Sequence, residues 1–131
     1  MPAPKIIVVE DDRIISIEIK DMLENFGYNV ISVVSYGEDA VTEALEKKPD
    51  LMLMDIRLAG KMDGIEAAEQ INLKLSIPII YLTSYSDQVT LKRAKKTNPM
   101  DYVLKPFVNL ELHGCIENAL KKHKKRTIKS K

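Results

Sequence analysis

The stretch Leu51-Met52-Leu53-Met54-Asp55 decides the fold expected for this chain. Four successive apolar residues are too few for a buried helix, but they suit a β-strand that is covered on both faces. The run ends abruptly in a carboxylate, so Asp55 is expected where a buried strand reaches the surface. A second apolar run, residues 6–9, ends in the same way in Glu10-Asp11-Asp12. Two buried strands are therefore predicted to deliver acidic side chains at their carboxyl ends.

Three further runs, rich in apolar and β-branched residues, complete the set of predicted strands. The five strands are expected at residues 5–9, 28–34, 51–54, 79–82 and 102–104. Each is followed by apolar residues at helical spacing, so strand and helix alternate at intervals of roughly twenty-five residues. That alternation predicts parallel strands joined by right-handed helical crossovers. The fold class is therefore α/β, with a five-stranded sheet covered by helices on both faces.

The helical spacing also predicts which residues face the core, and capping residues place several helix ends. The inward-facing residues are expected to be Ile15, Ile19, Met22, Leu23 and Phe26 in the first helix, Ala40, Val41, Ala44 and Leu45 in the second, Ile65, Ala68, Ile71 and Leu75 in the third, Val89, Leu91 and Ala94 in the fourth, and Leu112, Ile116, Ala119 and Leu120 in the last. Ser35 with Glu38, and Asp63 with Glu66, have the spacing of a capping box at a helix start. Gly27 is expected just past the end of the first helix.

Composition narrows the class of protein. The 131 residues are 45% hydrophobic and 30% charged, which is typical of one globular domain, and the net charge of +1 argues against nucleic acid as the main partner. The single cysteine, Cys115, cannot form an internal disulfide and fits a reducing, cytoplasmic location. We expect neither a secretion signal nor a membrane span. His113, Cys115 and His123 lack the spacing of metal ligands and are interpreted as packing or surface residues.

The chain is expected to divide into a domain at residues 1–120 and a basic tail at residues 121–131. The tail is lysine-rich, which invites a nucleic-acid interpretation. A solvated helix end or a severed linker is the preferred interpretation, because too little chain follows the domain to build a helix-turn-helix.

Polar residues gather at one edge of the predicted sheet, since ligands of doubly wound parallel sheets bind at the carboxyl ends of the strands. The residues at those ends are Glu10, Asp11, Asp12, Asp55, Thr83, Ser84 and Lys105. If the first and third strands are neighbours, Asp11 lies close to Asp55, and two unit charges about 4 Å apart at an effective dielectric near 20 repel by about 4 kcal/mol. A hard divalent cation such as Mg²⁺ or Mn²⁺, together with Lys105, would offset that repulsion. The edge therefore predicts a phosphoryl site with a carboxylate nucleophile.

Five motifs occur in order along the chain. They are Val9-Glu10-Asp11-Asp12, the apolar strand that ends in Asp55, Met62-Asp63-Gly64, Leu82-Thr83-Ser84, and Asp101-Tyr102-Val103-Leu104-Lys105-Pro106-Phe107. With these motifs the sequence resembles the response-regulator receiver domains of two-component signalling, over residues 5–120. The resemblance implies a flavodoxin-like fold with strand order 2-1-3-4-5.

The same resemblance implies roles for the acidic residues. Asp55 would be the phosphoacceptor. Glu10 and Asp11 would bind Mg²⁺ together with Asp55 and the backbone carbonyl of Arg57. Asp12 is expected to begin the first helix instead of binding metal.

The resemblance implies roles for the remaining polar strand ends as well. Thr83 would be a switch hydroxyl that moves to meet the phosphoryl group, and Ser84 would be its small neighbour, unless Ser84 caps the next helix. Lys105 would pair with the phosphate, and Pro106 would follow a cis peptide bond. Tyr102 would be an aromatic rotamer switch, although it also suits a strand residue that covers the edge of the core.

The function implied is a switch that accepts a phosphoryl group on Asp55 from a histidine kinase or phosphotransfer protein. The domain would supply its own catalytic groups without being a classical enzyme. The surface of the fourth helix, fifth strand and fifth helix would then signal to a downstream protein or form a homodimer. The fourth helix, expected at residues 86–97, has a thin apolar stripe, which suits a mobile element that faces a partner.

Two other classes of function remain open at this point. One is a receiver-like adaptor that binds a partner without phosphorylation. The other is a phosphatase with an aspartyl nucleophile, although such enzymes commonly need a second acid two residues on, where Arg57 stands.

The loop at residues 56–62 departs from the family pattern. It lacks the proline often found after the acceptor, and it is one residue longer than the commonest form. Arg57 and Tyr85, two positions beyond Asp55 and Thr83, are both bulky. We expect them to shield an acyl phosphate partly from water.

Overall fold

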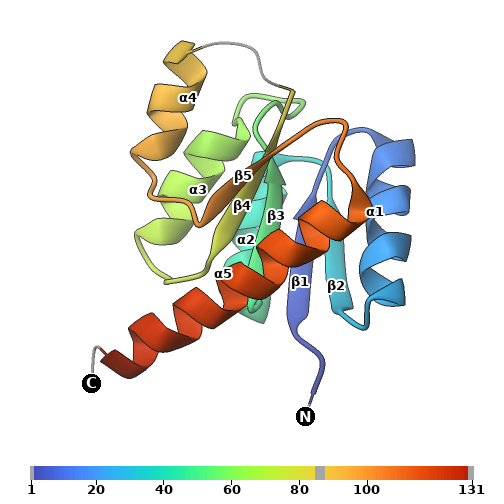
Figure 1. Cartoon of the computed structure of the whole chain (residues 1–131). Helices are drawn as coiled ribbons and strands as arrows, with labels where there is room; N and C mark the ends of the chain where they lie inside the picture. The colour runs from blue at the N-terminus through green and yellow to red at the C-terminus, as the bar shows by residue number, and fades with distance from the viewer. Residues whose placement is uncertain (1, 85–87, 130–131) are drawn as a thin grey trace.

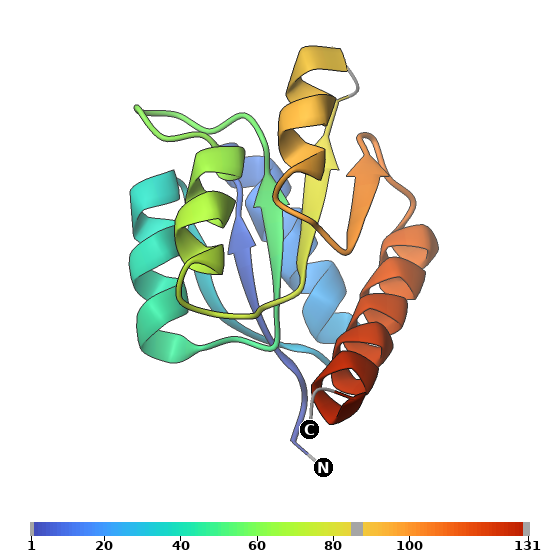
Figure 2. The same ribbon diagram turned by 90° about the vertical axis from the view of Figure 1, so that its left-hand side faces the viewer.

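The computed structural model describes residues 2–84 and 88–129, with side chains described as far as His123. Five parallel strands form one sheet in the order β2-β1-β3-β4-β5, the order that the resemblance implies (Figure 1). The elements in chain order are β1 (Lys5–Val9), α1 (Arg13–Asn25), β2 (Asn29–Val34), α2 (Gly37–Lys47), β3 (Leu51–Asp55), α3 (Gly64–Asn72), β4 (Ile79–Thr83), α4 (Gln88–Lys95), β5 (Asp101–Leu104) and α5 (Asn109–Lys129). Helices α1 and α5 cover one face of the sheet, and α2, α3 and α4 cover the other (Figure 2).

Strand β3 is the centre of the sheet and is buried along its whole length. Leu51 and Leu53 pack in the core beneath α1 and α5. Met52 and Met54 pack in the core beneath α2, α3 and α4. Because both faces of β3 are covered, every position must be apolar until the strand emerges at Asp55.

The register of the strands brings their carboxyl ends to one edge of the sheet. Val9 lies opposite Met54, Met54 opposite Tyr81, and Tyr81 opposite Tyr102. The residues that follow these positions therefore meet at the edge drawn uppermost in Figure 2. This is the edge that the sequence predicts for the site.

Most predicted strand and helix ends are confirmed to within a residue or two. Gly27 follows α1 with φ of +95°, a conformation that glycine adopts without strain. Asp63 and Glu66 form the predicted capping box at α3, with the Glu66 N–H donating to Asp63 Oδ1 at 2.8 Å and the Asp63 N–H donating to Glu66 Oε1 at 3.1 Å.

The capping box predicted at Ser35 and Glu38 is wrong. Helix α2 begins at Gly37, Tyr36 is the N-cap residue, and no side chain caps the helix. Tyr36 is extended, with φ of −118° and ψ of 146°, and an isolated parallel β-bridge pairs it with Ala59. The bridge holds the backbone extended one residue beyond Ser35, so the helix starts later than the motif suggests.

Helix α4 also differs in length from the prediction. Helix α4 ends at Lys95, earlier than expected, and the predicted residues 86 and 87 lie outside the described part. Among its predicted inward residues Ala94 is buried, whereas Val89 is 71% exposed and the prediction for it is wrong. Helix α5 continues past the sheet to Lys129, so the backbone of the lysine-rich segment is helical (Figure 1). Within the described residues, no helix combines the length and apolarity needed to cross a bilayer.

Two glycines give a matched test of the packing at the end of β3. A Cβ on Gly64 would lie 2.1 Å from the Asp55 carbonyl oxygen, whereas a Cβ on the exposed Gly114 of α5 would meet nothing within 4 Å. Gly64→Ala should therefore lower the free energy of unfolding by about 1–3 kcal/mol or more. Gly114→Ala should raise it by about 0.5–1 kcal/mol, because alanine favours a helix interior. Urea unfolding measures both, and effects of the same sign would contradict this account.

Candidate functional site

Three carboxylates meet where β1 and β3 end side by side. Glu10, Asp11 and Asp55 each offer a carboxylate oxygen, and these oxygens lie within 4.8 Å of one another. Glu10 is 2% exposed and Asp55 is 6% exposed, whereas Asp11 is open to solvent. The Glu10 N–H donates to the Val34 carbonyl oxygen at 3.0 Å, which fixes this end of β1 against β2. The predicted acidic residues therefore form one cluster.

Lys105 brings a positive charge into the cluster from β5. Its Nζ donates to Asp55 Oδ2 at 2.9 Å and to Glu10 Oε2 at 3.1 Å. The Lys105 backbone N–H donates to the Thr83 carbonyl oxygen at 2.8 Å, so the lysine is anchored to the end of β4. The bond from Lys105 to Pro106 is cis, as the resemblance implies.

The charges change the proton affinity of both partners. Burial, and then the neighbouring Asp55, raise the pKa of Glu10 to about 7, although Lys105 acts in the opposite direction. Burial alone would lower the pKa of Lys105, but Asp55 and Glu10 outweigh it and raise this pKa above its usual value. One ammonium thus stands against three carboxylates, and the excess negative charge suits a hard cation with oxygen ligands.

The two oxygens of Asp55 have different partners. Oδ2 faces Lys105, while Oδ1 accepts from the Arg57 backbone N–H at 3.3 Å. The Arg57 side chain is exposed on the loop that follows β3. Arg57 is thus tied through its backbone to the carboxylate that the sequence suggests as acceptor.

The predicted switch residues lie beside the cluster on β4 and β5. Thr83 is buried at the end of β4, and Tyr102 is half-buried on β5. Both line a pocket of about 420 Å³ between α4 and β5. Ser84 is exposed just beyond Thr83, and the predicted Tyr85 lies outside the described residues.

Asp12 does not belong to the cluster. Its Oδ1 accepts from the backbone N–H groups of Ile14 at 3.0 Å and Ile15 at 3.1 Å. Asp12 is therefore the N-cap of α1, which confirms its predicted place at the start of the helix.

Sequence reasoning missed two contacts around the loop between β3 and α3. One is the bridge from Tyr36 to Ala59. The other is an ion pair in which Arg93 Nη2 of α4 lies 3.1 Å from Asp63 Oδ2. Both join segments far apart in the sequence and depend on the fold, so no local pattern signals them.

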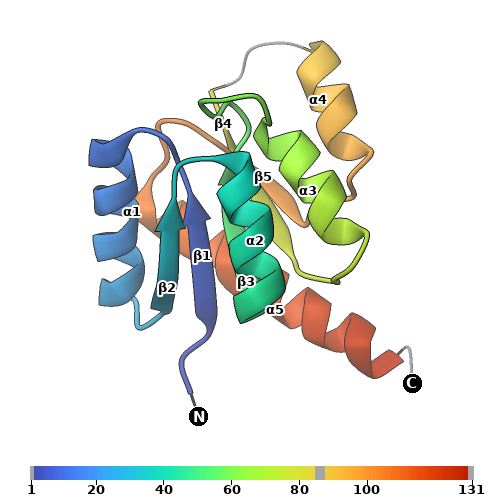
Figure 3. The same cartoon turned by 180° about the vertical axis from the view of Figure 1, so that it is seen from behind.

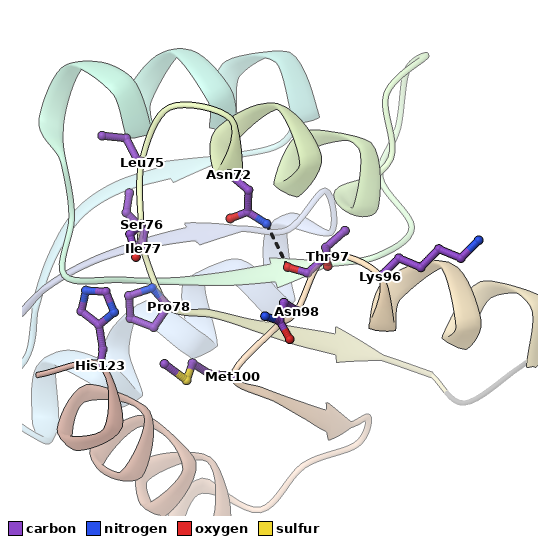
Figure 4. A pocket seen from close by; sticks show the side chains of 10 residues that line it. All are labelled: Asn72, Leu75, Ser76, Ile77, Pro78, Lys96, Thr97, Asn98, Met100 and His123. Atoms are coloured by element: carbon purple, nitrogen blue, oxygen red, sulfur yellow. Dashed lines mark hydrogen bonds between the residues drawn. The ribbon is translucent and has the colours of Figure 1, made fainter. Parts of the chain in front are cut away.

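The remaining candidate residues lie away from the cluster. His113 stacks on Phe26 with ring centroids 4.1 Å apart, and burial raises the pKa of Cys115 to about 11, so both suit packing roles. His123 lines a separate pocket of about 390 Å³ at the opposite end of β4 (Figure 4). In that pocket Asn72 Nδ2 donates to the Thr97 carbonyl oxygen at 2.9 Å. None of the predicted site residues is among those that line it.

Comparison with known proteins identifies the family. A model of the response regulator receiver domain matches residues 6–117. The chain belongs to this family.

Named relatives agree with that assignment. The chain is 33% identical over 123 residues to the transcriptional regulatory protein PdtaR of Mycobacterium tuberculosis, which covers 94% of this chain but only 60% of PdtaR. The receiver domain of a modulated diguanylate cyclase from Desulfovibrio desulfuricans G20 is 40% identical with a TM-score of 0.90, covering 95% of this chain and 98% of that one. The receiver domain of the sensor histidine kinase PA1611 from Pseudomonas aeruginosa PAO1 is 31% identical with a TM-score of 0.83, covering 91% and 98%. That structure has a magnesium ion coordinated in its active-site cleft.

Family membership carries general properties. Receiver domains are signalling switches of two-component systems, generally not classical enzymes, and they act with a histidine kinase or phosphotransfer protein. They bind Mg²⁺ at an acidic pocket, and Glu10, Asp11 and Asp55 form such a cluster here.

The raised pKa of Glu10 predicts how stability depends on pH without metal. Between its ordinary pKa of 4.5 and about 7, the folded protein keeps a proton on Glu10 that the unfolded chain releases. Because the folded state then binds more protons, the free energy of unfolding should fall as pH rises through this window. Urea unfolding in EDTA at about pH 5 and about pH 8 measures this. Glu10→Gln cannot titrate, so an equal pH dependence in wild type and variant would contradict the assignment.

Proposed function

We propose that this chain accepts a phosphoryl group on Asp55 from a histidine kinase or phosphotransfer protein, with Mg²⁺ or Mn²⁺ bound. The observation that carries the proposal is the placement of Lys105 Nζ between Asp55 Oδ2 and Glu10 Oε2, beside the acidic cluster. A buried acceptor, a fixed ammonium and a metal-competent acid pair are the parts that phosphoryl transfer needs.

The transfer step needs little covalent chemistry from the protein. A carboxylate oxygen of Asp55 attacks phosphorus, the new O–P bond forms, and the N–P bond to the donor imidazole breaks. The imidazole takes a proton from solvent as it leaves. Lys105 exchanges part of its ion pair with Asp55 for the oxygens of the incoming phosphoryl group, so its charge stays compensated throughout.

The donor set fits a hard dication. Glu10, Asp11, Asp55 and the backbone carbonyl of Arg57 would hold it. When bound, Mg²⁺ neutralises phosphoryl oxygens and so lowers the barrier to in-line transfer. The Arg57 N–H keeps Asp55 Oδ1 oriented, and the burial of Glu10 and Asp55 keeps competing water away from the acceptor.

The switch would pass from Asp55 to the surface through β4 and β5. The Thr83 hydroxyl would hydrogen-bond to the phosphoryl group, with the exposed Ser84 as a small neighbour and Pro106 shaping the turn after Lys105. Movement of Thr83 would free space in the pocket that it shares with Tyr102, and the Tyr102 ring would turn inward. The phosphoryl group thereby favours one of two pre-existing states.

The output surface would be the one formed by α4, β5 and α5. On it Val89 is 71% exposed and Leu104 is 45% exposed, which leaves apolar side chains for a downstream protein or for a second copy of the chain. Residues 1–120 would be the phosphoacceptor domain and residues 121–131 the basic helix end that follows it. We place the switch in the cytoplasm, where Cys115 stays reduced.

The function can be tested by intact mass after incubation with acetyl phosphate and Mg²⁺. Wild type should gain the mass of one phosphoryl group. Asp55→Asn should gain none because the nucleophile is gone, and wild type in EDTA should gain none because the developing charge is uncompensated.

The controls separate the other classes of function. A gain that persists in Asp55→Asn would place the acceptor elsewhere. A folded wild type that gains no mass from acetyl phosphate or from a phosphohistidine donor would favour the phosphorylation-independent adaptor. Steady turnover of a small phosphate ester would favour the phosphatase, although this chain has Arg57 where such enzymes commonly need a second acid.

The bulky residue after the acceptor should affect the lifetime of the acyl phosphate. Arg57→Asn is expected to shorten the lifetime several-fold, because a smaller side chain lets water reach the phosphoryl group. Lys61→Asn is the matched control, since it removes an exposed cation from the same loop. Loss of phosphoryl mass over time, after acetyl phosphate is removed, measures both. Equal lifetimes in wild type and Arg57→Asn would rule out shielding, and Tyr85→Ala tests the second predicted shield in the same way.

A further inference from the structure

The loop between β3 and α3 needs support that the sequence pattern does not supply. It spans residues 56–63 and lacks the proline that often follows the acceptor in this family. Its two ends are tied together, because the Gly64 N–H donates to the Ile56 carbonyl oxygen at 2.8 Å. The segment between these ends projects beyond the sheet, next to the amino end of α2 (Figures 2 and 3).

Tyr36 and Gly37, the N-cap and the first residue of α2, contact this projecting segment. Tyr36 pairs with Ala59 in the isolated parallel bridge. Its ring lies over Gly60, since a Cβ on Gly60 would be 3.2 Å from Tyr36 Cδ1. At Gly37, a Cβ would lie 2.8 Å from the Met62 carbonyl oxygen, so the loop packs directly on the helix start. The loop thus has one contact near its middle and another near its end.

Tyrosine is an unfavourable residue at the N-cap position that Tyr36 occupies in α2. It occupies the N-cap of α2, where serine, threonine, aspartate and asparagine are preferred because their side chains accept from the first N–H groups. The Tyr36 side chain makes no cap hydrogen bond and is 47% exposed. Tyr36 neither caps its helix nor fills the core, but it does contact the loop at Ala59 and Gly60. Local rules are broken in this way where a site demands it.

The position of Tyr36 is itself tied to the acidic cluster. The Val34 carbonyl oxygen, two residues before Tyr36, accepts from the Glu10 N–H at 3.0 Å. At the other end, Arg57 lies two residues before Ala59, and its N–H donates to Asp55 Oδ1. The bridge from Tyr36 to Ala59 therefore lies within a series of contacts that runs from the backbone of Glu10 to the carboxylate of Asp55.

We propose that Tyr36 is a positioning residue for the phosphorylation site, whose ring and backbone hold the loop so that the backbone at Arg57 keeps one position beside Asp55. This role rests on the proposed function, in which the Arg57 carbonyl binds the metal. The ring supplies the rigidity that a proline would otherwise give to this loop. The atoms of Tyr36 nearest to Gly60 are ring carbons, so the proposal assigns the role to the ring and not to the phenol hydroxyl.

Tyr36→Asn tests the role because it removes the ring and installs a preferred N-cap. Amide hydrogen exchange of residues 57–62 in EDTA should become faster in this variant. Calorimetric titration with Mg²⁺ should show binding weaker by about 10-fold, the size of effect that follows loss of a group supporting a metal ligand. The melting temperature in EDTA should stay the same or rise. Tyr36→Phe keeps the ring and should match wild type, as should Leu73→Asn, which changes an exposed residue elsewhere.

The outcomes distinguish this role from a structural one and from the proposed function. Unchanged loop exchange in Tyr36→Asn would overturn the proposal. So would weaker Mg²⁺ binding that comes with a lower melting temperature and faster exchange throughout the protein, because the effect would then be loss of fold. If wild type itself binds no Mg²⁺, the proposed function fails. Even in that case, the ring would be shown to hold the loop if exchange at residues 57–62 became faster in Tyr36→Asn and in neither of the other two variants.

Discussion

The site depends on one partly buried ammonium group, that of Lys105, placed between two buried carboxylates. Lys105 Nζ lies 2.9 Å from Asp55 Oδ2 and 3.1 Å from Glu10 Oε2, and the two acids are almost fully excluded from solvent. Removing one partner from such a buried pair typically costs about 3–5 kcal/mol, because the other charge is left uncompensated. Apolar residues would fill the same space with less risk to stability, so the charges are explained by chemistry and not by folding. Every other feature of the sheet edge serves to bring these three side chains together.

The order of the strands makes this placement possible. Glu10 directly follows β1, Asp55 ends β3 and Lys105 directly follows β5, and β4 lies between β3 and β5. The lysine spans that distance with its long side chain while its backbone is fixed to Thr83 of β4. Burial, and then the neighbouring Asp55, raise the pKa of Glu10 even with Lys105 beside it. In the proposed function, a bound dication would relieve the repulsion between the carboxylates and would offset the negative charge that a phosphoryl group brings.

A feature can be predicted from the sequence when it depends only on which residues of one strand or helix are buried. The run before Asp55 could be assigned to a strand because both its faces are covered, and the meeting of polar strand ends follows from parallel strands alone. The order of the strands cannot be predicted in this way, because every order of five strands gives the same periodic pattern in the sequence. The predicted order therefore rests on the resemblance to receiver domains. The spacing of Ser35 to Glu38 fits the motif of a capping box, but the long-range bridge from Tyr36 to Ala59 keeps the backbone extended there and α2 begins at Gly37. Local patterns therefore miss contacts that exist only once the sheet has formed.

The bridge from Tyr36 to Ala59 supports the part of the site that lies on a loop, whereas the rest of the site lies at the ends of rigid strands. Asp55 is the last residue of a strand, and Glu10 and Lys105 directly follow strands, with their backbone N–H groups bonded to Val34 of β2 and Thr83 of β4. The loop after Asp55 has no such support, and yet it carries the backbone that orients the acceptor through the Arg57 N–H. Holding the loop by an aromatic ring from a neighbouring turn, instead of by a proline within it, leaves residues 56–62 freer to vary in sequence. Under the proposed function, differences in metal affinity and acyl phosphate lifetime would then arise from loop side chains such as Arg57, while the charges of Glu10, Asp55 and Lys105 stay in place.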